Sequence, residues 1–106
     1  MAGRRAKRLR AIDHVAVGFV GPSASFTGDL VDLSKTGLLV RCSQSLKPGA
    51  LGRIGIPMGQ DTMRAMVAVR RHVPPIGLAF EFIQMSQRDR ELLHRLLKRI
   101  ETAAGT

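Results

Sequence analysis

The sequence has little or none of several residue types, and each shortage narrows the classes of protein that fit it. Cys42 is the only cysteine in 106 residues, so no disulfide can form within the chain, and a reducing compartment is expected. Trp and Tyr are absent and Phe occurs four times, which counts against a protein that stacks single-stranded nucleic acid on aromatic rings. No apolar run approaches the roughly 18 residues that span a membrane, and the run after the basic N-terminus is too short for a signal peptide. We therefore expect a cytoplasmic protein without a membrane span.

Positive charge is what the sequence has in excess. It contains 17 Lys and Arg against 8 Asp and Glu, a formal net charge of +9. This balance favours anionic partners such as nucleic acid, nucleotide phosphates or an anionic membrane surface, but it does not choose among them. The length and a hydrophobic fraction of 44% predict one folded domain that needs neither a metal nor a disulfide.

Residues 12–85 carry the pattern of an all-β domain, in which short apolar runs are separated by Gly, Pro, Ser and Asp. Alternation at a period of two predicts six strands, at residues 12–20, 26–33, 38–42, 51–57, 62–73 and 76–83. Antiparallel strands joined by short turns predict a closed or nearly closed β-barrel, because closure removes unpaired sheet edges. The basic residues 1–11 before them are expected to form a flexible arm.

The period changes to that of a helix after Ser86. One apolar stripe at helical spacing consists of Leu92, Leu93, Leu96, Leu97 and Ile100. Ser86 fits an N-cap, and Asp89 three residues later fits the far side of a capping box. The sequence therefore predicts a helix over 86–102 that packs on the outside of the barrel or across one end.

Catalysis and metal binding find no support in the pattern. His14, His72 and His94 are far apart and lack a second ligand at metal-binding spacing. A hydrolase triad of Ser34, His72 and Asp32 would lack a nucleophile elbow. We predict no catalytic residues, no metal and no cofactor.

Residues 32–37, "DLSKTG", allow two interpretations. As a turn, Asp and Ser would bond their own backbone and Gly37 would supply a positive φ. As a site, Asp32 and Ser34 lie two residues apart at a strand end, so both side chains can face one way. They would then form an acceptor pair for the N–H donors of guanine's Watson–Crick edge. Arg4 and Arg8 offer the complement, because guanidinium groups donate in pairs to phosphates and to guanine O6 and N7.

The segment "RRAKR" (4–8), followed by "DLSKTG", resembles the RxxxR and (D/N)xSxxG signature of PilZ domains, bacterial receptors for cyclic di-GMP. The resemblance covers nearly the whole chain, including the last predicted strand and the helix. It implies a six-stranded antiparallel PilZ-like barrel with a C-terminal helix. It also implies that Arg4 and Arg8 grip phosphates and guanine from the arm, while Asp32, Ser34 and Gly37 hold a guanine at the barrel. Arg5, Lys7 and Arg10 would add accessory charge.

Ligand binding would then draw the arm onto the barrel and change the surface offered to a downstream protein effector, in a process such as motility, exopolysaccharide or biofilm formation. Two alternatives stay open: a small basic barrel that binds nucleic acid, and a PilZ-like domain that only binds proteins. Arg41, Arg70 and Arg71 would also be able to line the site, but no local pattern assigns them.

Overall fold

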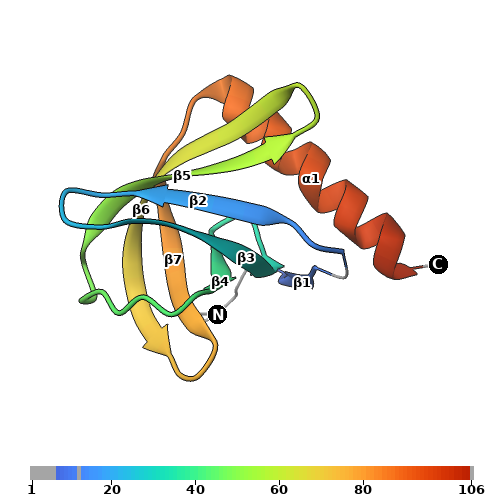
Figure 1. The fold of residues 1–106 in the computed structure, drawn as a ribbon. Helices are drawn as coiled ribbons and strands as arrows, with labels where there is room; N and C mark the ends of the chain where they lie inside the picture. The colour runs from blue at the N-terminus through green and yellow to red at the C-terminus, as the bar shows by residue number, and fades with distance from the viewer. Residues whose placement is uncertain (1–6, 12, 106) are drawn as a thin grey trace, which may run out of the picture.

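The computed structural model describes residues 7–11 and 13–105, which contain seven strands and one helix (Figure 1). Their bounds are β1 Leu9–Arg10, β2 Ala16–Val20, β3 Ser25–Leu33, β4 Gly37–Arg41, β5 Leu51–Met58, β6 Asp61–Val73, β7 Gly77–Gln84 and α1 Gln87–Gly105.

Six of the strands close into a barrel. Each strand pairs antiparallel with its neighbour in the order β3-β2-β5-β6-β7-β4, and β4 pairs back onto β3. Register shifts in the β6–β7 and β3–β4 pairings bend these strands, as closing so small a barrel requires. The predicted six-stranded antiparallel barrel with a C-terminal helix is confirmed.

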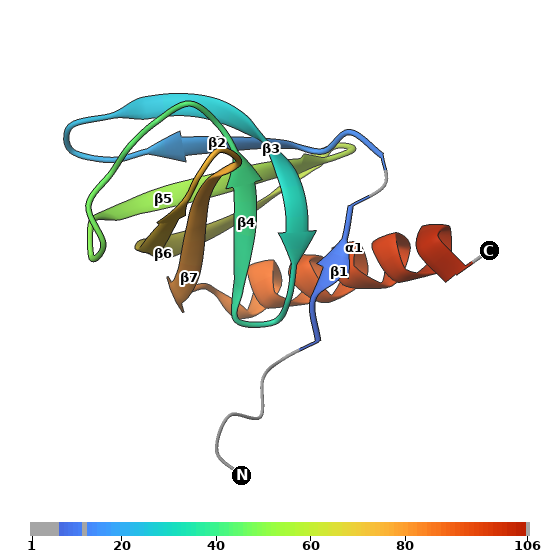
Figure 2. The same cartoon turned by 90° about the horizontal axis from the view of Figure 1, so that it is seen from below.

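Strand β1 is an addition that the sequence pattern did not predict. Leu9 pairs with Leu33 and Arg10 with Asp32, so β1 lies along the same edge of β3 that β2 occupies further on (Figure 2). The first strand was predicted at 12–20, but β2 begins only at Ala16, and residues 13–15 belong to no strand. Residues 1–6 lie outside the described residues, so the flexibility of the arm remains a prediction.

The core fills the barrel interior from the alternating inward positions of the strands. Val17 and Phe19 of β2 face Ile54 and Ile56 of β5, and all four are at most 2% exposed. Phe80 of β7 stacks on Phe19 with ring centroids 5.4 Å apart. The apolar stripe of α1 joins the same cluster through Leu92, Leu93, Leu96 and Ile100. Barrel and helix therefore share one core.

Helix α1 packs against β6 and β1. Ser86 caps its start as predicted, because the hydroxyl accepts a hydrogen bond from the Asp89 N–H at 3.0 Å. The Asp89 carboxylate returns to the Ser86 hydroxyl, at 2.6 Å, rather than to the backbone N–H that a full capping box would use. The helix continues to Gly105, beyond the predicted end at 102, because the Ala-rich tail favours helix. Within the described part of the chain, no helix combines the length and the apolar character needed to span a membrane.

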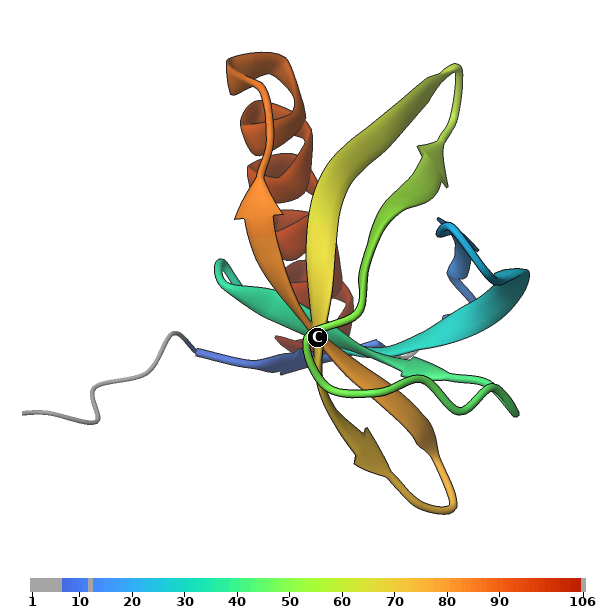
Figure 3. The ribbon, with the colours of Figure 1, turned by 90° about the vertical axis from the view of Figure 1, so that its left-hand side faces the viewer.

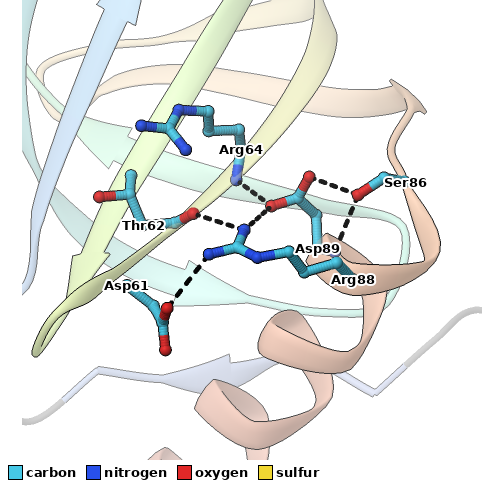
Figure 4. A network of polar contacts seen from close by, with 6 residues as sticks. All are labelled: Asp61, Thr62, Arg64, Ser86, Arg88 and Asp89. Atoms are coloured by element: carbon cyan, nitrogen blue, oxygen red, sulfur yellow. Dashed lines mark hydrogen bonds and ion pairs between the residues drawn. The ribbon is translucent and has the colours of Figure 1, made fainter.

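Asp89 also contacts β6 near its N-terminal end. It accepts a hydrogen bond at 2.9 Å from the backbone N–H of Arg64, which lies beyond the last pairing of β6 with β7 (Figure 4). Arg88 adds an ion pair to Asp61 at 3.1 Å, at the tip of the β5–β6 hairpin. Burial opposes ionisation of Asp89, but the hydrogen bonds from Ser86 and Arg64 and the nearby guanidinium charges outweigh it, so the pKa of this carboxyl is lowered.

Candidate functional site

The centre of the candidate site is an ion pair between the two motifs. A terminal guanidinium nitrogen of Arg8 lies 2.6 Å from a carboxylate oxygen of Asp32, although 24 residues separate them in sequence. The pairing of β1 with β3 brings them together, because Arg10 lies opposite Asp32 and Arg8 is two residues earlier. Arg8 is 48% and Asp32 23% exposed, so both can be reached from solvent.

The two described accessory cations, Arg10 and Lys7, lie beside different elements. Arg10 is exposed on β1 and faces the same stretch of β3 as Arg8. Lys7 instead lies 3.3 Å from Glu101 of α1, so the residue next to Arg8 links the basic segment to the helix. Arg4 and Arg5 lie outside the described residues, so their predicted roles stay predictions.

Ser34 is buried, with 1% of its surface exposed, and its hydroxyl organises the turn between β3 and β4. The oxygen accepts hydrogen bonds from the N–H groups of Thr36 at 3.1 Å and Gly37 at 3.2 Å. It also lies 3.2 Å from the Thr36 hydroxyl. The serine therefore makes the local bonds of a turn, while Asp32, two residues earlier, remains partly exposed at the strand end.

Position 37 requires glycine because the backbone of the neighbouring strand lies very close to it. A Cβ at this position would lie 2.2 Å from the carbonyl oxygen of Phe80, on the neighbouring strand β7. The expectation that Gly37 supplies a positive φ is wrong, since among the described residues positive φ angles occur at Gly49 and Gly59. The glycine lets β4 and β7 lie close together directly after the turn.

The structure adds residues that sequence reasoning did not single out. Lys35 and Thr36 are exposed at the apex of the turn, inside the motif itself. Glu81 of β7 pairs in register with Gly37 and lies 3.8 Å from the guanidinium of Arg70, one of the arginines that the sequence left unassigned. The available signal was the position of Lys35 and Thr36 at the centre of the turn, where side chains point to solvent.

The histidines and the other acidic residues do not gather into a metal site. Across residues 7–11 and 13–105, no group of three or more His, Cys, Asp or Glu side chains is arranged to hold a metal ion. His14 lies 3.1 Å from Asp29 on the barrel surface.

Comparison with known families gives one clear match. The family model described as the PilZ domain matches residues 3–99. Comparison with curated proteins gives no match.

Comparison with solved structures gives the same fold. The PilZ domain of YcgR from Escherichia coli, solved with c-di-GMP, has a TM-score of 0.74 and 21% identity, and the alignment covers 96% of this chain and 94% of that one. The PilZ domain of CeSA from a cellulose-synthesising bacterium has a TM-score of 0.74 and 19% identity, over 91% of this chain and 99% of that one. The Bacillus subtilis inhibitor of motility, MotI/DgrA, has a TM-score of 0.69 and 19% identity, over 91% of this chain and 50% of that one. At these identities the likeness concerns the fold.

Proposed function

Because this chain belongs to the PilZ domain family, we propose that it is a non-enzymatic receptor for cyclic di-GMP, acting in the bacterial cytoplasm without a cofactor. One observation carries the proposal: the Arg8 guanidinium and the Asp32 carboxylate, from the two motifs of the family signature, lie 2.6 Å apart at the surface. The similar PilZ domain of Escherichia coli YcgR was solved with c-di-GMP, which supports the same ligand class.

The chemistry of the pair matches the two kinds of group on this ligand. Guanidinium donates paired hydrogen bonds to phosphate oxygens or to guanine O6 and N7. A carboxylate only accepts, so Asp32 is suited to the N–H donors on guanine's Watson–Crick edge. Arg10 and Lys35, both exposed, would add positive charge around the two phosphates.

In the structure these two groups contact each other, so a ligand that binds both would have to replace their mutual contact. Arg8 would turn from Asp32 to a phosphate or a guanine, and Asp32 would turn to guanine N–H groups. Arg8 would exchange a carboxylate for a phosphate or a guanine, and Asp32 would exchange a guanidinium for neutral N–H donors, so each group keeps a hydrogen-bond partner. The Lys7–Glu101 contact next to Arg8 offers a path by which this exchange would alter α1 and the surface presented to an effector.

Ser34 and Gly37 act in this proposal by shaping the turn. The Ser34 hydroxyl is occupied by the N–H groups of Thr36 and Gly37. Gly37 allows the close approach to β7. Together they fix where β3 ends and hence the position of Asp32. The cellular process that is regulated would depend on the effector protein and not on this site.

Calorimetric titration with cyclic di-GMP tests the proposal. We expect saturable binding, and Arg8→Ala should weaken it about ten- to hundredfold, the effect of losing a charge-assisted hydrogen bond. Asp32→Ala separates two roles. It weakens binding if Asp32 holds guanine, and it strengthens binding if Asp32 only competes for Arg8.

Two exposed residues of α1 serve as matched controls, Arg95→Ala for the lost cation and Glu91→Ala for the lost carboxylate. Both should bind like the unmodified protein. No binding at micromolar ligand would contradict the proposal. Tight, steeply salt-dependent binding of an oligonucleotide in its place would favour the nucleic-acid barrel.

A further inference from the structure

A groove of about 820 Å³ lies on the outside of the barrel, over β2, β5 and β6, and reaches the segment between β7 and α1. Its lining includes Val20, Met66 and Met85, together with Arg53 and Arg64. Neither Arg8 nor Asp32 lines it, so it is separate from the candidate ligand site.

Two glycines that face each other across β2 and β5 shape the groove. Gly18 pairs in register with Gly55, so two neighbouring outward positions of the sheet carry no side chain. A Cβ at Gly18 would come no nearer than 3.9 Å to another atom, the Gly55 carbonyl oxygen, and its φ is not positive. Neither backbone conformation nor steric conflict therefore requires glycine at position 18, and the open space is available to a ligand.

Apolar surface borders this depression in the next row of the sheet. Val20, Arg53, Met66 and Gln84 follow one another across four strands. Val20 is 62% exposed, and Leu51, two residues before Arg53 on β5, is 52% exposed. Exposed apolar side chains beside a groove indicate a binding surface, and a Met side chain adapts to different partners.

The charged side chains that line the groove are two arginines and one carboxylate, that of Asp89. Gly55 pairs with Arg64 and Met66 with Arg53, so the two arginines are diagonal neighbours, roughly 7–8 Å apart at the backbone. The guanidinium of Arg64 extends away from Asp89, which contacts only its backbone N–H (Figure 4). The Asp89 carboxylate is 14% exposed and bonded to Ser86 and Arg88, and it offsets part of the Arg64 charge, so the two arginines leave the groove lining with a net positive charge.

The contacts at the start of α1 hold the groove open. Arg88 and Asp89 tie the helix to the β5–β6 hairpin, which stands beside it (Figure 3). The hairpin is therefore held at its tip as well as in the barrel, which limits the rearrangement that a partner would require. A preformed site loses less conformational entropy on binding.

We propose that this groove docks an extended, acidic and apolar segment of a partner protein, with carboxylates on Arg53 and Arg64 and an apolar side chain over Gly18 and Gly55. A peptide fits better than a phosphate polymer because the lining combines two arginines with apolar side chains, whereas a nucleic-acid surface needs a denser array of cations. The inference goes beyond the receptor role and does not depend on cyclic di-GMP binding.

The test titrates the isotope-labelled protein with a hexapeptide of alternating Glu and Leu and follows the backbone amides by NMR. We expect saturable shifts centred on Gly18, Gly55 and Arg64. Gly18→Val, which fills the depression at a position where an added Cβ has room, should abolish them. The double variant Arg53→Ala with Arg64→Ala should weaken binding about tenfold.

Three comparisons complete the experiment. Arg95→Ala, which removes an exposed cation from α1, should bind the peptide normally, and Gly18→Val should retain its affinity for cyclic di-GMP. An oligo-dT probe should not compete with the peptide. The proposal is overturned by shifts that map elsewhere, by binding that Gly18→Val does not affect, by competition from oligo-dT, or by no saturation at about 1 mM peptide.

Discussion

Replacing Gly37 by alanine tests whether this motif glycine serves the barrel or the ligand. The added Cβ would lie 2.2 Å from the Phe80 carbonyl oxygen, about 1.2 Å short of the 3.4 Å at which ordinary contact begins. Because the obstacle is backbone, no side-chain rotation relieves it. The strands β4 and β7 would have to separate.

The cost follows from the bonds around this point. Separation would strain the hydrogen bond from the Phe82 N–H of β7 to the Thr36 carbonyl oxygen, which is 2.9 Å long. A net loss of about 1 kcal/mol for this bond and about 1 to 3 kcal/mol for the strain of overpacking give roughly 2 to 4 kcal/mol. For a domain of this size, such a loss lowers Tm by roughly 10–20 °C.

Urea denaturation at neutral pH, followed by circular dichroism, measures the effect. Gly18→Ala is the matched control, since its Cβ has room, and it should raise the free energy of unfolding by about 0.4–1 kcal/mol. If Gly37→Ala unfolded at the same urea concentration as the unmodified protein, the steric reasoning would be refuted. Normal stability with weaker cyclic di-GMP binding would place the glycine at the ligand instead.

Two further predictions concern the helix. Leu96→Ala should lower the free energy of unfolding by about 2–5 kcal/mol, since Leu96 is fully buried between α1 and the barrel, and urea denaturation would measure it. The lowered pKa of Asp89 means that its ionised form stabilises the fold above its unfolded value of 3.8, and this contribution disappears as the pH falls through the lower folded value. Asp89→Asn should therefore have a lower free energy of unfolding than the unmodified protein at neutral pH, and that free energy should fall less between neutral pH and pH ~3. An equal fall in both proteins would contradict the role given to Asp89.

Most of the barrel follows from alternation in the sequence. The runs at 26–33, 51–57 and 62–73 differ from β3, β5 and β6 by at most one residue at either end. Their inward positions carry large apolar side chains, so the period of two is unambiguous. Strand β1 was missed because two residues show no period, and only the pairing with Leu33 and Asp32 defines it.

The candidate site was also predictable only in part. The conjunction of Arg8 and Asp32 was predicted from motif spacing, and the structure brings them into contact. The buried position of Ser34 was not predictable, because its hydroxyl is consumed by N–H groups whose direction depends on the folded turn. The groove at Gly18 and Gly55 depends on the register between β2 and β5, and no local pattern reports the register between strands so far apart in the sequence.

The short strand β1 also attaches the residues that precede it in the chain to the barrel. Its pairing with β3 fixes the backbone at Leu9, directly after Arg8, on the barrel wall. Arg4 is four residues before Arg8, so covalent geometry keeps the two Cα atoms within about 14 Å. If Arg8 binds the proposed ligand, a second contact from Arg4 is an intramolecular step, which proceeds at a high effective concentration.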